Sequence, residues 1–251
     1  MAPQKNRAII LKILPYRESS YIVYLFTEAH GLVHSIAKGI RRQKRGINFL
    51  ERGFLIENML YVRPNRDLHI MGNVQVLDFF PEIRSSLSKG AVRDTAFETV
   101  LSAITVTDPH PELFDFFSSF LETLGTSPEK ECVPFALWRF FITFADIMGF
   151  KLNTERCARC GRPADDQVSF LNFSKGGIEC GGCVKTLSQS ARIRPEVLKF
   201  LSSPDVEAGL LKSALSRMEI NQTTRALSDY CRYHFDVRGE FKSLDFLEGM
   251  E

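Results

Sequence analysis

Residues 21–27 read Tyr21-Ile22-Val23-Tyr24-Leu25-Phe26-Thr27, a run in which six of seven side chains are apolar or aromatic. Successive residues of a β-strand point to opposite faces, so odd-numbered and even-numbered positions fall on different sides. Both sets are apolar here, which predicts a strand buried on both sides. Such a strand is typical of a small closed barrel.

Four further apolar or β-branched runs surround this stretch within the first 80 residues. They predict strands at 8–14, 32–37, 54–62 and 68–77, separated by turn-forming glycines and prolines. Five short strands in so few residues favour an OB-type barrel, a fold that often binds single-stranded nucleic acid. An SH3-like barrel is the alternative.

Charge is unevenly distributed along the 251 residues. The net charge is +2, but residues 1–80 contain 12 Lys and Arg against 6 Asp and Glu, whereas residues 81–251 contain 20 against 24. A basic first third predicts contact with a polyanion. The alternative is a chance imbalance of solvated surface.

The basic charge is densest between the third and fourth predicted strands. Five of the eight residues from 38 to 45 are basic, and we call Lys38, Arg41, Arg42, Lys44 and Arg45 the basic segment. Such a loop can follow a phosphate backbone and release counterions, so we predict that it binds nucleic acid; the alternative is a solvated loop. Further candidates are four arginines that extend the patch and four rings that stack on bases: Arg17, Arg52, Arg63, Arg66, Tyr16, Phe49, Phe54 and Tyr61. For Phe54 and Tyr61 a core position is favoured.

After residue 80 the hydrophobic period becomes helical. Helices are predicted at about 83–106, with a kink near Gly90, and at 112–125, 133–149, 195–201, 206–218 and 222–235. The helix at 133–149 is apolar on nearly all sides and belongs in the middle of a bundle. Thr223 or Thr224 is the expected cap of the last helix. The predicted fold is therefore α+β, with a barrel domain at 1–80 and a helical domain at 81–251.

Two Cys-x-x-Cys pairs interrupt the helical part. Cys157 and Cys160 are separated from Cys180 and Cys183 by nineteen residues, the spacing of two knuckles that hold one structural Zn²⁺ tetrahedrally. We assign a zinc-finger insertion to residues 154–186. A redox-active pair leaves the second pair unexplained, and disulfides are rare in the cytoplasm, which is the expected location in the absence of an apolar signal core or membrane-spanning run. Cys132 and Cys231 are expected to be small buried hydrophobes.

No catalytic constellation is present, and we predict that the protein is not an enzyme. The sequence contains neither the glycine-rich loop of ATP-driven proteins nor a nucleophile elbow. His110-Pro111-Glu112 followed by a Cys-x-x-Cys resembles a zinc deaminase pattern, but Arg156 stands where that pattern has proline. It would also leave Cys180 and Cys183 without a role.

Several short motifs, in order and spacing, resemble the RecO family of bacterial recombination mediators, over nearly the whole chain. They are Tyr16-Arg17-Glu18-Ser19, Phe26-Thr27-Glu28-Ala29-His30-Gly31, Ala37-Lys38-Gly39-Ile40-Arg41-Arg42, Phe80-Pro81-Glu82-Ile83-Arg84, Pro111-Glu112-Leu113-Phe114, Gly149-Phe150, the two knuckles with Phe173 and Gly176-Gly177-Ile178 between them, Leu227, Tyr233-His234 and Lys242-Ser243-Leu244-Asp245-Phe246-Leu247.

This resemblance implies an N-terminal OB-fold, a helical C-terminal domain and an inserted zinc finger. It also implies binding to single- and double-stranded DNA, annealing of complementary strands without ATP, and partnership with RecR and single-strand-binding protein in loading RecA. It places the protein on the bacterial nucleoid when it is bound to DNA. The competing hypotheses are a sequence-independent RNA-binding or ribosome-associated protein, a protein-binding scaffold, and an enzyme.

Overall fold

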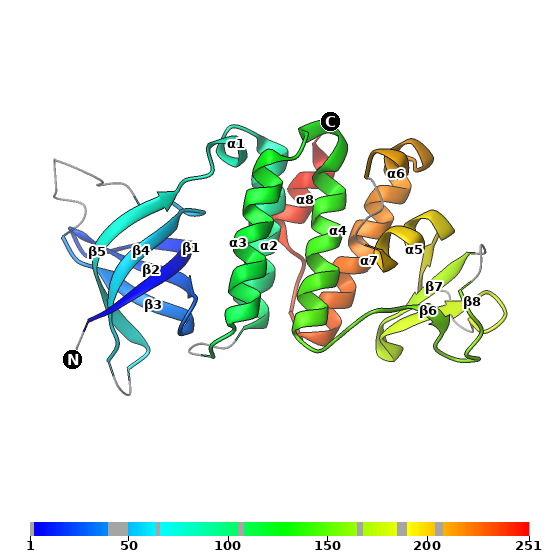
Figure 1. Cartoon of the computed structure of the whole chain (residues 1–251), viewed down its shortest axis with the longest axis horizontal. Helices are drawn as coiled ribbons and strands as arrows, with labels where there is room; N and C mark the ends of the chain where they lie inside the picture. Colours follow the sequence, from blue (N-terminus) through cyan, green and yellow to red (C-terminus); the bar gives the residue numbers. More distant parts are fainter. Residues whose placement is uncertain are drawn as a thin grey trace. The chain divides into compact units, whose positions relative to one another are not determined.

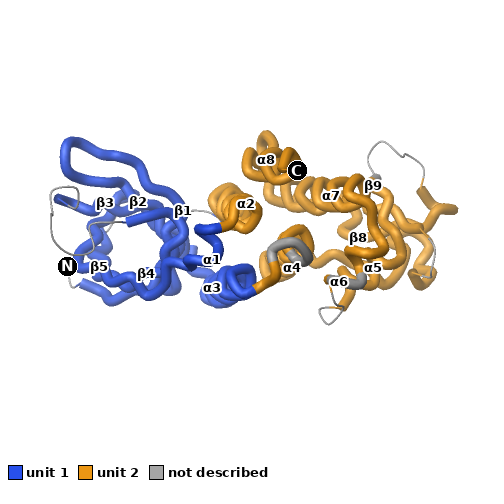
Figure 2. The backbone as a smooth tube through the Cα atoms, turned by 90° about the horizontal axis from the view of Figure 1, so that it is seen from above, with its two compact units in different colours: residues 1–85, 103–126 blue, residues 86–102, 127–251 orange. Residues whose placement is uncertain are grey.

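The computed structural model describes residues 3–39, 50–63, 66–104, 108–164, 168–184, 190–203 and 208–250. Its contacts divide the chain into two compact units. Unit 1 comprises Met1–Ser85 and Ala103–Thr126, and unit 2 comprises Ser86–Ser102 and Ser127–Glu251 (Figure 2). No helix within the described ranges combines the length and the apolar character needed to cross a membrane.

Unit 1 contains the predicted five-stranded barrel (Figure 1). The barrel closes in the order β1-β2-β3-β5-β4, and every pairing is antiparallel except the parallel one between β3 and β5. This confirms the fold predicted from the alternating apolar runs. The strands are β1 (Gln4–Tyr16), β2 (Ser20–Thr27), β3 (Gly31–Ala37), β4 (Leu55–Tyr61) and β5 (Leu68–Asp78).

The second strand is buried on both sides at only one of its ends. Val23 and Leu25 point into the barrel core. On the outer side, Phe26 packs against Phe114 and Phe117 of α3 (Pro111–Thr126), with ring centroids 5.8 and 5.9 Å apart. Ile22 and Tyr24 remain half-exposed, so the expectation of burial along the whole strand was wrong. The outer face is buried at Phe26, where α3 packs against it.

The connection after the barrel also differs from the prediction. Instead of one helix kinked at Gly90, the chain forms α1 (Pro81–Arg84) and α2 (Leu87–Ala103). Ser86 accepts the backbone N–H of Lys89 through its hydroxyl at 3.2 Å, which is the bond an N-cap makes. The helix therefore restarts at Ser86, and Gly90 lies inside it.

Unit 2 is built around α4 (Glu129–Ile147) and α7 (Arg217–His234) (Figure 1). The aromatic side chains of α4 are fully buried, as expected for a central helix: Phe135, Trp138, Phe140, Phe141 and Phe144. Within the described residues, this unit also contains α2, α5 (Pro195–Ser202), α6 (Ala208–Ala214) and α8 (Lys242–Gly249).

The C-terminal part of the chain differs from the prediction at the start of α7 and agrees with it in the packing of the tail. Helix α7 begins five residues earlier than predicted, because Ser216 and Glu219 form a complete capping box. Thr223 and Thr224 are both buried inside the helix, so neither of them is its cap. The tail packs back as expected through Phe241, which stacks on Phe141 with centroids 6.5 Å apart, although Phe246 is exposed.

A four-stranded sheet carries the cysteine knuckles. Its order is β6-β8-β7-β9, and β7 and β8 form an antiparallel hairpin, which turns through Gly176 at φ +60°. The outer strands were not predicted, because they are short and lack an alternating pattern. The strands are β6 (Asn153–Cys157), β7 (Ser169–Asn172), β8 (Gly177–Cys180) and β9 (Ser190–Ile193).

Candidate metal centre and nucleic-acid interface

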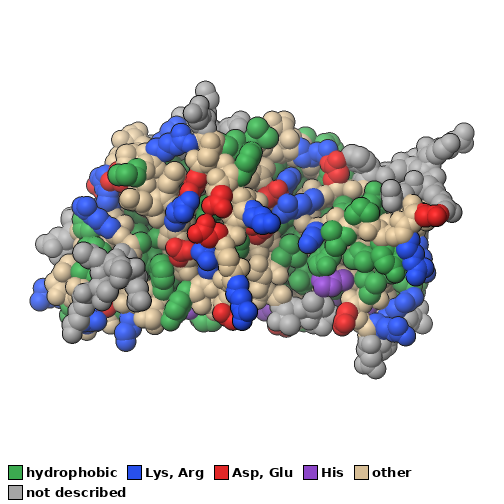
Figure 3. Space-filling view, turned by 180° about the vertical axis from the view of Figure 1, so that it is seen from behind, with side chains coloured by type: hydrophobic (Ala, Val, Ile, Leu, Met, Phe, Trp, Pro, Cys, Tyr) green, Lys and Arg blue, Asp and Glu red, His purple; other side chains and the backbone are tan. Residues whose placement is uncertain are grey.

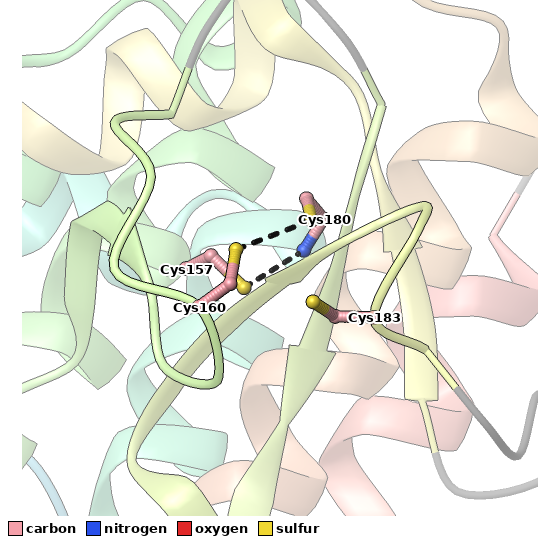
Figure 4. A group of neighbouring side chains, drawn as sticks. All are labelled: Cys157, Cys160, Cys180 and Cys183. Carbon is pink, nitrogen blue, oxygen red and sulfur yellow. Dashed lines mark hydrogen bonds between the residues drawn. The ribbon is translucent and has the colours of Figure 1, made fainter.

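Each cysteine pair begins at the end of a strand. Cys157 ends β6 and Cys180 ends β8, and these two strands are parallel neighbours. Cys160 and Cys183 follow in the turns beyond the strands, and all four side chains converge on one point (Figure 4). The parallel pairing of β6 and β8 therefore brings together two knuckles that are far apart in sequence.

The sulfur geometry fits a metal ion. The four Sγ atoms lie within 4.8 Å of one another, and the thiols are free rather than joined in disulfides. The Sγ atoms of Cys160 and Cys180 are 3.8 Å apart. A tetrahedron with metal–sulfur bonds of about 2.3 Å has edges of about 3.8 Å, so this separation suits four-thiolate coordination. The cluster can therefore hold one metal ion with four cysteine ligands.

Hydrogen bonds favour the thiolate form of Cys157. The backbone N–H of Cys180 donates to Sγ of Cys157 at 3.4 Å. Burial acts to raise the pKa of the Cys157 thiol, but this bond and the backbone N–H of Cys160 help to lower the pKa to about 6. The thiolate is the form that binds metal. Hydrogen bonding with the thiols of Cys160 and Cys180 raises the pKa of Cys183 to about 12.

The turn of the first knuckle is held by backbone bonds and by an ion pair. The N–H of Gly161, whose φ is +72°, donates to the carbonyl of Cys157 at 2.9 Å. The guanidinium of Arg159 lies 3.3 Å from the carboxylate of Glu179 on β8, whose side chain is buried. The sequence reasoning missed Glu179. A carboxylate next to the third cysteine and an arginine inside the first pair were the available signal.

The barrel bears the first residue of the basic segment. Lys38 is exposed and directly follows β3. The other four members, Arg41, Arg42, Lys44 and Arg45, lie outside the described residues, as does Phe49. Arg17 lies in the β1–β2 turn, and Arg63 and Arg66 lie in the β4–β5 connection.

The remaining candidate rings differ in exposure. Phe54 is buried in the barrel core, as favoured, and the guanidinium carbon of Arg84 lies 5.2 Å from its ring centroid. Tyr16 and Tyr61 are half-exposed. The sequence reasoning treated Tyr24 as buried, but its ring lies on the outer barrel surface, 4.1 Å from the His34 ring. His110, the histidine of the pattern that resembles zinc deaminases, lies close to Asp108, with its Nε2 3.2 Å from the carboxylate.

Protein-family models match both the N-terminal and the C-terminal part of the chain. Residues 1–80 match the family described as recombination protein O N terminal, and residues 84–245 match recombination protein O C terminal. Among similar proteins, the DNA repair protein RecO of Prosthecochloris aestuarii is 28% identical over 245 residues, covering 92% of each chain. The DNA repair protein RecO of Syntrophus aciditrophicus is 30% identical over 87% of this chain and 80% of its own. That of Pelobacter propionicus is 31% identical over 73% of each.

Proposed function

This chain belongs to the RecO family of DNA repair proteins, and from that premise we propose that it is a recombination mediator that binds single- and double-stranded DNA and anneals complementary strands without ATP. We further propose that it works with RecR to load RecA onto single strands covered by single-strand-binding protein. The observation that carries the proposal is the family match over both parts of the chain. The N-terminal match covers the residues that form the closed barrel.

The proposed annealing mechanism is electrostatic. Two complementary strands repel each other through their phosphates, and a basic surface that neutralises both strands lowers the barrier to pairing. In the proposal, the basic segment supplies this charge, beginning at Lys38 where β3 ends. Screening of this kind needs no hydrolysis, so the proposed role is not enzymatic.

The proposed metal is one Zn²⁺ ion with a structural role, bound by Cys157, Cys160, Cys180 and Cys183. Zinc accepts four thiolates in tetrahedral geometry and would clamp the two knuckles together without offering a site for substrate. The proposed domains are 1–80 and 81–251 with the zinc finger at 154–186. A thiolate zinc site is consistent with a reducing compartment, and the proposed location is the bacterial cytoplasm, on the nucleoid when DNA is bound.

Strand annealing tests this function. Two complementary oligonucleotides coated with single-strand-binding protein are mixed without ATP, with and without the full chain, and duplex formation is followed by energy transfer between end labels. We expect acceleration. Absence of acceleration, together with tight binding to structured RNA, would instead support the RNA-binding alternative.

The role of the basic segment is tested by salt dependence. Removing three of its charges should weaken DNA binding and reduce the slope of log affinity against log salt by about 0.7 per lost contact to single strands. An equal number of exposed lysines of unit 2 provides the control, and their removal should leave the slope unchanged. The variant carries Arg41→Ala, Arg42→Ala and Lys44→Ala, and the control carries Lys151→Ala, Lys175→Ala and Lys242→Ala.

A further inference from the structure

One stretch of the outer barrel surface is apolar and aromatic yet only half-covered. Strand register places Lys12 opposite Tyr24, and Tyr24 opposite His34. The neighbouring positions Val23 and Val33 are buried, so the three side chains share the outer side of β1, β2 and β3. Ile22 and Ile36, which also pair, extend the surface and are half-exposed. We call these five residues the aromatic face.

Within this face, Tyr24 contacts both Lys12 and His34. The Tyr24 and His34 rings lie with centroids 4.1 Å apart at an interplanar angle of 49°. The Lys12 ammonium lies 5.5 Å from the Tyr24 centroid, which is within the range of a cation–π contact. The tyrosine ring is therefore held between a cation and a second ring while one part of it stays accessible.

We infer that the aromatic face stacks unpaired nucleobases and gives the barrel a preference for single-stranded over double-stranded DNA. The inference rests on the proposed DNA-binding function and assigns the residues that read strand state. Every nucleobase presents a π-face, so stacking tolerates any sequence. In a duplex these faces are already occupied by neighbouring bases, whereas the phosphates remain available in both forms. Phosphate contacts alone therefore do not give this preference.

The charges around the face suit a strand whose backbone is anionic. Arg17 lies in the turn that joins β1 to β2, and Lys38 follows the end of β3, four residues beyond His34. The β4–β5 connection, which carries Arg63 and Arg66, leads into β5 opposite His34. On the side of the molecule drawn in Figure 3, hydrophobic and basic side chains lie next to one another. Among the described acidic residues, Glu18 lies in the β1–β2 turn and the Asp67 carboxylate interacts with His34.

Burial also favours a neutral His34 ring. It lowers the pKa of His34 below its ordinary value; the Asp67 carboxylate opposes this shift, and His69 adds to it. A neutral imidazole at neutral pH acts as a flat ring beside Tyr24. The phosphate attraction then comes from the lysines and arginines.

The experiment compares a fluorescein-labelled oligothymidine with an abasic oligomer that has the same number of phosphates. Anisotropy titrations with the full chain should show tighter binding to oligothymidine. Tyr24→Leu keeps an apolar side chain on the strand but removes the ring, and it should weaken oligothymidine binding about tenfold. Binding of the abasic oligomer, binding of a duplex with the same number of phosphates, and the salt slope should not change, so the preference of the unaltered chain for oligothymidine over the duplex should be lost. Tyr24→Phe keeps the ring and should bind like the unaltered chain.

Tyr233→Leu is the matched control, since Tyr233 is an exposed tyrosine of unit 2 and is 56% accessible. It should leave both affinities unchanged. Equal affinity of the unaltered chain for the two oligomers, or an unchanged oligothymidine affinity in Tyr24→Leu, would overturn the inference while leaving DNA binding intact. Failure to bind either oligomer would overturn the proposed function as well. Thermal unfolding of each variant checks that it folds.

Discussion

The indole N–H of Trp138 donates a hydrogen bond of 2.7 Å to the Thr224 hydroxyl, joining α4 to α7 inside unit 2. Thr224 in turn donates to the carbonyl of Ile220 at 2.8 Å. Trp138 is the only tryptophan in the chain and is fully buried. The hydroxyl therefore satisfies the one polar atom of the largest side chain in this core.

Replacing Thr224 by Val should lower the free energy of unfolding by about 1–3 kcal/mol, because a buried indole N–H loses its acceptor. Urea titration followed by tryptophan fluorescence measures this change. Thr224→Ser keeps the hydroxyl and should cost less. If Val and Ser cost the same, the loss comes from packing and the hydrogen bond contributes nothing measurable.

Two glycines with similar positive φ angles allow the cost of backbone strain to be distinguished from the cost of a steric collision. Gly31 has φ +63° and Gly39 has φ +70°. A Cβ at Gly31 would lie 1.8 Å from the carbonyl oxygen of Asp108, whereas a Cβ at Gly39 would meet no atom of the described residues within 4 Å. Gly39→Ala should therefore cost about 1–2 kcal/mol of stability from backbone strain alone. Gly31→Ala should cost about 1–3 kcal/mol more.

Chemical denaturation of both variants, followed by far-ultraviolet circular dichroism, checks the prediction. Equal costs would mean that the Asp108 segment moves away from the β2–β3 turn without penalty.

The capping box at the start of α7 should make stability depend on pH. The backbone N–H and hydroxyl of Ser216 both donate to the Glu219 carboxylate at 2.8 Å, and they help to hold the pKa of Glu219 below its ordinary value. A carboxylate with a depressed pKa stabilises the fold above its unfolded pKa, and this contribution is lost as pH falls through the folded pKa. Glu219→Gln should thus destabilise the protein most at neutral pH and progressively less below about pH 4.

Thermal unfolding at several pH values gives this difference directly, with Ser216→Ala as a companion that should cost about 1 kcal/mol. A Glu219→Gln penalty that stays constant from pH 7 to pH 3 would show that the charge of the carboxylate does not matter.

The proposed zinc site should be separable from DNA annealing. Cys160→Ser, tested in freshly purified and reduced protein, should reduce bound zinc well below one ion per chain and lower the unfolding temperature, because a closed four-thiolate site stabilises only the fold. The annealing rate at 25 °C should be retained. Elemental analysis and the annealing assay measure the two effects. Cys231→Ala is the control, since Cys231 is buried in α7 and lies outside the cluster, so one zinc should remain.

The sequence predicted features whose signal is local. The alternating apolar runs identified all five barrel strands, and the cysteine spacing identified a cluster whose sulfurs lie within 4.8 Å of one another. The apolar character of residues 133–149 on all sides predicted the central position of α4, where Trp138 and its neighbours are buried. These signals persist because period and spacing follow directly from backbone geometry.

Other features depend on which residue of another element a side chain packs against, and local sequence patterns do not indicate these tertiary neighbours. Thr224 and Ser216 are both acceptable caps by composition, but the packing of α7 on α4 buries Thr224 against Trp138 and leaves Ser216 to cap the helix. Tyr24 and Phe26 are both apolar positions on one strand, but Phe26 packs against α3 and Tyr24 stays half-exposed. Burial is a property of what covers a residue, and only the folded arrangement of elements determines it.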